Sequence, residues 1–122
     1  MAQYVPSTEQ LVLELFVRDV GVSKAFYVAL GFEVLEDRGT FVTLGWEEHR
    51  LFLDERAEEL PPAPPSPQAN IRVMVADVDA YWSRAQALGA PVAAPIGDRE
   101  YGLRDFTIVD PDGFGVRFGT RL

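Results

Sequence analysis

The sequence predicts an α+β fold made of two βαβββ modules in tandem. Three observations carry this prediction: the order of strand-like and helix-like segments, a repeat at one fixed offset, and a proline-rich stretch between the copies. The first module covers residues 1–60, the linker residues 61–69 and the second module residues 70–122. A chain of 122 residues suits one compact domain, or two small halves that share a core.

The first module follows the order strand, helix, and then three strands. Residues 11–17 are rich in strand formers, and residues 19–31 have the apolar spacing of a half-buried helix that ends at Gly31. The polar segment Gly45–His49 predicts a hairpin between the last two strands. The three predicted strands are 32–36, 40–44 and 50–54, and the inward helix face is Val22, Ala25, Phe26, Ala29 and Leu30.

The same order returns after the linker. Residues 71–75 predict a strand, and residues 77–89 predict a helix with Asp77 as its N-cap. The inward face of this helix is expected to carry Val78, Tyr81, Trp82, Ala85 and Leu88. Shorter strands are predicted at 92–93, 104–109 and 116–119, with a tight turn at Asp110–Gly113.

The two modules match at an offset of 58 residues, the separation of Asp19 and Asp77. Asp-Val begins each predicted helix, and Leu-Gly ends each one. Seven identities fall within 18 residues without a gap. We interpret this as an internal repeat, in which one module alone would bury too little surface to be stable.

Composition excludes several classes of site. The absence of cysteine removes disulfides, thiolate nucleophiles and cysteine-based metal sites, and the single His49 rules out a multi-histidine centre within one chain. A net charge of −8 argues against nucleic-acid binding. The excess lies in residues 1–60, with 12 acidic and 5 basic side chains. Apolar runs fall short of the roughly 20 residues of a membrane span, so no membrane partner is expected and the protein is predicted to be cytoplasmic.

The chain resembles the vicinal oxygen chelate superfamily, which includes glyoxalase I, extradiol dioxygenases, fosfomycin-resistance enzymes and bleomycin-resistance proteins. The resemblance rests on the paired modules, on Phe26–Phe32 (Phe-Tyr-x-x-Leu-Gly-Phe) and on the Asp-Pro-Asp-Gly turn at Asp110–Gly113. It extends from about Leu11 to Gly119. It implies that eight strands curve into a concave cup, and that homodimers build each cup from both chains.

The resemblance also indicates where metal ligands would lie. Three of the family's ligand positions fall on Val12, Asn70 and Arg117, and a further glutamate position falls near Phe52 or Leu53. Valine cannot coordinate, an amide oxygen is a weak ligand, and arginine is a cation. We therefore expect neither a metal nor another cofactor.

The resemblance to the bleomycin-resistance-like branch implies an aromatic binding surface. Phe41 and Tyr101 match aromatic positions of that branch, and flat rings suit planar ligands. Two departures are evident: Arg72 replaces the family's tryptophan, and one residue is inserted around Leu103. An Arg72/Arg117 pair would suit an anionic or carbonyl-bearing ligand better than a cation.

Three further side chains have open interpretations. Alternation from Val12 places Glu14 on the expected cup face. A carboxylate at this place could act as a general base, pair with an arginine or anchor the amine of a ligand. Trp46 is either a lid over the cup or an exposed hairpin aromatic. His49 is expected to be exposed, and Trp82 to lie in the core.

The resulting hypothesis is a non-catalytic homodimer that sequesters a planar or aromatic small molecule of antibiotic type. The expected ligand-binding residues are Phe41, Tyr101, Arg72, Arg117, Glu14, Asn70 and Trp46. The alternative is a superfamily enzyme, either metal-free with Glu14 as base or with an atypical metal site of oxygen ligands. A third hypothesis is a scaffold protein whose own side chains fill the cup.

Overall fold

The computed structural model describes residues 3–122, so the predicted first boundary at residue 1 lies outside the described residues. The chain divides into two compact units, Met1–Pro61 and Pro62–Leu122. Each unit contains one βαβββ repeat built around a four-stranded mixed sheet. The predicted α+β fold with tandem modules is therefore confirmed.

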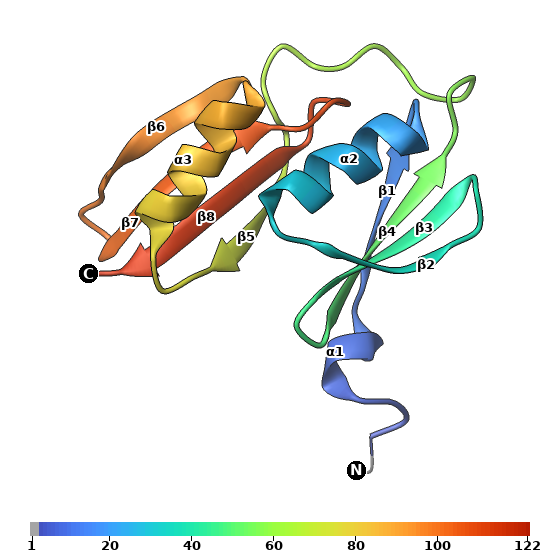
Figure 1. Ribbon diagram of the computed structural model, residues 1–122, viewed down its shortest axis with the longest axis horizontal. Helices are drawn as coiled ribbons and strands as arrows, with labels where there is room; N and C mark the ends of the chain where they lie inside the picture. The colour runs from blue at the N-terminus through green and yellow to red at the C-terminus, as the bar shows by residue number, and fades with distance from the viewer. Residues whose placement is uncertain (1–2) are drawn as a thin grey trace. The chain divides into compact units, whose positions relative to one another are not determined.

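The first unit places one helix on one face of its sheet (Figure 1). The strand order is β1-β4-β3-β2, in which β1 and β4 are parallel and the other pairs are antiparallel. The elements are α1 (Ser7–Gln10), β1 (Leu13–Val17), α2 (Val20–Leu30), β2 (Glu33–Asp37), β3 (Phe41–Trp46) and β4 (His49–Glu55). The single turn α1 is absent from the sequence prediction, because one turn carries no periodic signal.

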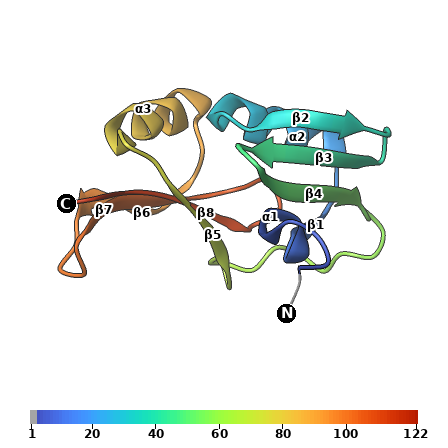
Figure 2. The ribbon, with the colours of Figure 1, turned by 90° about the horizontal axis from the view of Figure 1, so that it is seen from below.

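The second unit repeats this plan, with α3 lying over one face of its sheet (Figure 2). The strand order is β5-β8-β7-β6, and β5 and β8 are again the parallel pair. The elements are β5 (Asn70–Met74), α3 (Val78–Leu88), β6 (Val92–Asp98), β7 (Leu103–Val109) and β8 (Gly115–Arg121). Within residues 3–122, no helix has the length and hydropathy needed to span a bilayer.

The repeat extends to the helix caps. The bounds of α3 are those of α2 shifted by the same offset of 58 residues that separates Asp19 and Asp77. Asp19 accepts a hydrogen bond from the Val22 N–H at 3.1 Å, and Asp77 accepts one from the Ala80 N–H at 3.3 Å. Each helix ends at a left-handed glycine, as the sequence predicts.

Strand β6 is longer than the sequence predicts. Strand β6 extends to Asp98 rather than ending at residue 93, although it contains Pro95. An edge strand tolerates proline because the missing N–H faces away from the sheet, and β6 also has two register shifts against β7. The prediction failed because alanine, proline and glycine give a weak strand signal.

The inward face of α2 is also rotated from the predicted one. Phe26 and Leu30 are buried as expected, but Val22 is 52% exposed, and Ala25 and Ala29 are exposed as well. Tyr27 is fully buried instead, with its ring at 5.3 Å from the Phe32 ring. The helix is apolar on several sides, so its periodicity alone could not select the stripe that the sheet covers.

In the second unit the core lies between α3 and the sheet. The ring of Tyr81 stacks on Phe118 at 4.9 Å, and Trp82 contacts Phe106 at 5.0 Å. Val78 and Ala85 are buried, whereas Leu88 is 37% exposed, contrary to prediction. Because α3 covers this face only, the opposite face of the sheet is free to present functional side chains.

Candidate functional site

The face of the second sheet opposite α3 carries a polar cluster around Asp105. Strand alternation places Arg72 on this face of β5, Arg117 on β8 and Asp105 on β7. Arg72 and Arg117 are direct neighbours in the parallel ladder, and Asp105 lies opposite Gly119. The sheet register therefore collects charges that are up to 45 positions apart in the chain.

Asp105 is the centre of this cluster. Its side chain is 3% exposed and accepts hydrogen bonds from two arginines. Arg99 Nε donates to Oδ1 at 2.8 Å, and Arg117 donates to Oδ2 through Nε at 3.0 Å and through Nη2 at 2.5 Å. Arg99 Nη2 also donates to the carbonyls of Pro95 and Asp105. One buried carboxylate thus holds two guanidinium groups in place.

The same contacts determine the charge state of Asp105. Burial alone would raise the pKa of this carboxyl, but hydrogen bonds from Arg99, Tyr101 and Arg117 outweigh burial and lower it below its ordinary value of 3.8. The carboxyl is therefore ionised at neutral pH. In return, its hydrogen bond and charge raise the pKa of Arg117.

The side chain of Tyr101 is fixed in position by hydrogen bonds to this cluster. It lies in the hairpin loop between β6 and β7, whose Gly102 has the positive φ of 88° that favours glycine. The Tyr101 hydroxyl donates to Asp105 Oδ2 at 2.6 Å and accepts from Arg117 Nη2 at 2.8 Å. Tyr101 is nevertheless 59% exposed. Its hydroxyl is anchored while its ring remains available for contact with a ligand.

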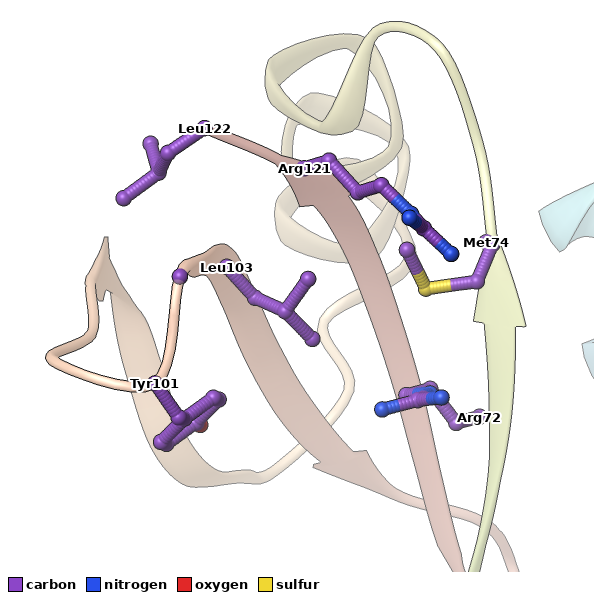
Figure 3. A pocket seen from close by; sticks show the side chains of 7 residues that line it. Arg72, Met74, Tyr101, Leu103, Arg121 and Leu122 are labelled. Atoms are coloured by element: carbon purple, nitrogen blue, oxygen red, sulfur yellow. The ribbon is translucent and has the colours of Figure 1, made fainter.

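A cavity of about 540 Å³ opens beside Tyr101. Figure 3 shows Tyr101 and Leu103 on one side of it, and Arg72 and Met74 on the other. The side chains that line it are those of Arg72, Met74, Tyr101, Leu103, Arg121 and Leu122. This volume falls within the range of roughly 300–1,000 Å³ that is usual for small-molecule sites.

Gly119, which has no side chain, is the neighbour of the cavity residue Met74 in the sheet. Gly119 lies between Met74 and Asp105 in the sheet, on the same face as both. A Cβ at this position would lie 3.6 Å from Met74 Sδ and 3.5 Å from Asp105 Cβ. A larger side chain there would therefore extend over the sheet face that carries Met74 and Asp105, next to the cavity.

The two arginines that line the cavity, Arg72 and Arg121, differ from Arg117 in their ion pairing. Neither Arg72 nor Arg121 forms an ion pair with any carboxylate in the described part of the chain, and both are exposed. The sequence prediction paired Arg72 with Arg117. Arg72 and Arg117 are neighbours on one face of the sheet, as that pairing requires, but Arg117 is ion-paired with Asp105, and it is Arg121 that lines the cavity together with Arg72.

The predicted residues of the first unit lie on the open face of their own sheet. Glu14 is on β1, and Phe41 is on β3, where its ring contacts Phe52 at 5.4 Å. A side-chain hydrogen bond with Asp54 raises the pKa of Glu14 above its ordinary value of 4.5, and burial and the charge of Asp54 act in the same direction. Arg56 in turn contacts Asp54 at 3.0 Å. Glu14 therefore belongs to a carboxyl pair.

The remaining predicted residues are not among those that line the cavity. Asn70 is on the same face as Arg72, at the start of β5, but is not among the cavity side chains. Trp46 is on the α2 side of its sheet, where its ring contacts Phe32 at 5.0 Å. His49 begins β4 and is exposed, as expected. Trp82 packs on Phe106, also as expected.

The residues at the superfamily's metal positions do not fit a metal ion. Arg117 is a cation whose N–H groups are directed to Asp105 and Tyr101, and Val12 offers no donor atom. Residues 3–122 contain no group of three or more His, Cys, Asp or Glu side chains that could hold a metal ion. The candidate site is therefore the cavity with its arginines and Tyr101.

Sequence reasoning missed four parts of this site: Asp105, Gly119, Arg121 and Met74. Alternation could have found three of them, because Gly119 and Arg121 follow Arg117 at two-residue steps and Met74 follows Arg72. Alternation also places Asp105 on this face of the sheet, but it does not reveal what Asp105 does there. Its role depends on the loop that returns Arg99 and Tyr101 to it.

Comparison with known proteins supports the fold. No curated protein sequence matches the chain. Among solved structures, a protein of unknown function from Agrobacterium tumefaciens str. C58 is 27% identical, with a TM-score of 0.78 and 98% of each chain covered. TioX from Micromonospora sp. ML1 is 23% identical, with a TM-score of 0.76, over 92% of this chain and 98% of TioX. A lactoylglutathione lyase from Agrobacterium tumefaciens is 24% identical, with a TM-score of 0.70 over 94% of each chain.

The family model that describes the Glyoxalase/Bleomycin resistance protein/Dioxygenase superfamily matches residues 9–118, which is nearly the whole described chain. The match includes both repeats and the cavity strands β5, β7 and most of β8. The chain belongs to the Glyoxalase/Bleomycin resistance protein/Dioxygenase superfamily.

Proposed function

We propose that this protein is a non-catalytic, bleomycin-resistance-like member of its superfamily that binds and sequesters a planar small molecule of antibiotic type. The observation that carries the proposal is the cavity beside Tyr101. It combines apolar contact from Met74 and Leu103 with an anchored aromatic ring, as small-molecule sites do. Protection of a cell by such a protein requires tight binding and protein in excess of the drug.

The chemistry of the cavity side chains supports binding rather than turnover. Arginine keeps its proton at neutral pH, and methionine and leucine cannot transfer one. The Tyr101 hydroxyl is engaged by Asp105 and Arg117. Within the described chain, the cavity thus has no side chain free to act as a nucleophile or general base.

Calorimetric titration with flat aromatic compounds, including bleomycin-type and enediyne-type antibiotics, tests the proposal. At least one compound is expected to bind with a Kd below about 1 µM and to be recovered unchanged. Tyr101→Ala is expected to weaken that binding about 10-fold, because stacking on the ring is lost. Tyr4→Ala is the control, since Tyr4 is 94% exposed and lies in the other unit. Absence of any such ligand would overturn the proposal.

A second candidate function is a metal-free enzyme in which Glu14 is the general base. The observation that favours it is the carboxyl pair of Glu14 and Asp54, because a raised carboxyl pKa suits proton transfer. In that case Glu14→Gln abolishes turnover of a substrate while ligand binding persists. Glu33→Gln on the exposed strand β2 is the control with the same chemical change. Unchanged turnover in Glu14→Gln would exclude this role.

The proposed functional form is a homodimer. Apolar side chains on the surface of the first unit support it, among them Phe16 at 48% and Leu35 at 47% exposure. Light scattering is expected to show twice the chain mass of 13.6 kDa, and a monomeric mass would contradict the dimer.

A further inference from the structure

The cavity is lined by two positively charged side chains that form no ion pair within the described chain. Arg72 and Arg121 come from the adjacent strands β5 and β8, and Figure 3 shows their side chains on either side of Met74. By contrast, Arg104 contacts Asp79 at 2.9 Å and Asp98 at 3.1 Å. Both side chains are exposed, so water solvates them in the free protein, and their N–H groups remain available to an anionic ligand that enters the cavity.

The neighbouring cluster adds to this positive field. Asp105 supplies one negative charge to Arg99 and Arg117 together, so the three side chains keep a net charge of one positive unit. The whole chain nevertheless carries a net charge of −8. The positive charges thus gather at one place on an acidic protein, where they would attract an anion and repel a cation.

We propose that the cavity binds a flat organic anion whose carboxylate or sulfonate group is held by Arg72 and Arg121. This inference rests on the proposed function, because both use the same cavity. The ring of the ligand lies against Tyr101 and Leu103, on the side of the cavity opposite Arg72 (Figure 3). The guanidinium group suits this role because its N–H groups match the two oxygens of a carboxylate or sulfonate.

Met74 completes the arrangement. It lies between the two arginines in the cavity, and it is 40% exposed. Its thioether packs well against the edge of an aromatic ring. One side of the cavity thus combines Met74 with arginine, the other carries Tyr101 and Leu103, and an aromatic anion can contact both sides at once.

Two dyes with the same ring system test the proposal. The anionic dye is 8-anilinonaphthalene-1-sulfonate, and N-phenyl-1-naphthylamine is its counterpart without the sulfonate. Fluorescence titration of the full chain is expected to give about 10-fold tighter binding of the anionic dye, since two charge-assisted contacts are added. Equal affinity for the two dyes would overturn the anion preference.

Variants locate the preference. Arg72→Gln and Arg121→Gln are each expected to weaken binding of the sulfonate dye about 3-fold and to leave the neutral dye unchanged. The double variant is expected to bind both dyes equally. Arg84→Gln is the matched control: it removes the same charge, but Arg84 lies on α3 over the Tyr81 ring, on the other face of the sheet.

The outcomes separate this inference from the proposed function. If the neutral dye binds and Tyr101→Ala weakens it, but the arginine variants leave the sulfonate dye unaffected, the anion proposal is wrong and the binding function stands. If neither dye binds, this inference fails, and the proposed function then depends on the antibiotic titrations. If Arg84→Gln weakens binding of the sulfonate dye as much as Arg72→Gln does, the effect comes from the overall charge of the protein, and the proposed anion site is wrong.

Discussion

Replacing Asp105 by asparagine is expected to lower the free energy of unfolding by about 3 kcal/mol at neutral pH. The change keeps the shape of the side chain but leaves Arg99 and Arg117 without their shared carboxylate. Asp105 is buried, so water cannot replace the lost interaction. Urea unfolding monitored by circular dichroism measures the difference.

The effect of Asp105→Asn is expected to depend on pH. The pKa of Asp105 is lower in the folded chain than its ordinary value of 3.8. Its contribution to stability is therefore fully present above about pH 4, and it is lost as the pH falls through the lower, folded-state pKa. In that acidic range, the difference in the free energy of unfolding between the natural protein and Asp105→Asn is expected to become smaller.

Asp98→Asn is the control for this prediction. Asp98 contacts Arg104 in the same unit, but its side chain is 62% exposed. Exposed ion pairs contribute less than about 1 kcal/mol, so this variant is expected to unfold almost like the natural protein. Equal destabilisation by the two substitutions would contradict the central role of Asp105.

A leucine at position 119, beside the cavity residue Met74, is expected to abolish ligand binding without unfolding the chain. In Gly119→Leu, the new Cβ makes contacts at 3.5 Å and 3.6 Å, which are ordinary distances, so the backbone need not move. The rest of the leucine side chain extends into the space that the ligand would occupy. Binding of 8-anilinonaphthalene-1-sulfonate is expected to weaken at least about 100-fold, because overlap with a ligand cannot be relieved cheaply in a packed site.

Gly119→Ala is the control that separates blocking of the cavity by a side chain from the effect of replacing glycine within β8. Alanine adds only the Cβ, so dye binding is expected to remain close to that of the natural protein. Its stability is expected to rise by about 0.5 kcal/mol, since glycine weakens a strand. Tight dye binding by Gly119→Leu would show that the dye binds elsewhere.

Much of the fold could be predicted because the signals are local. Asp19 and Asp77 cap the two helices, Gly31 and Gly89 end them, and strand alternation follows from the residues themselves. Strand β6 was mostly missed, because its position at the sheet edge, which makes Pro95 tolerable, is a tertiary property. The buried face of α2 was misjudged for a similar reason.

The site divides along the same line. Arg72, Tyr101 and Arg117 were selected from the sequence, and the structure brings all three to one face of one sheet. Glu14 and Phe41 instead lie in the other unit, and Trp46 packs on Phe32. The sequence also assigned Arg117 to the ligand, whereas Asp105 engages it.

By itself, the sequence determined the two modules, their helices and most of their strands, because these depend on neighbours within a few residues. Only the tertiary structure decided which charges compensate one another. The contacts of Asp105 with Arg99, Tyr101 and Arg117 depend on a loop conformation and on the register of β7 against β8. A shift of one residue would turn these side chains to the opposite face, and no local pattern encodes that choice.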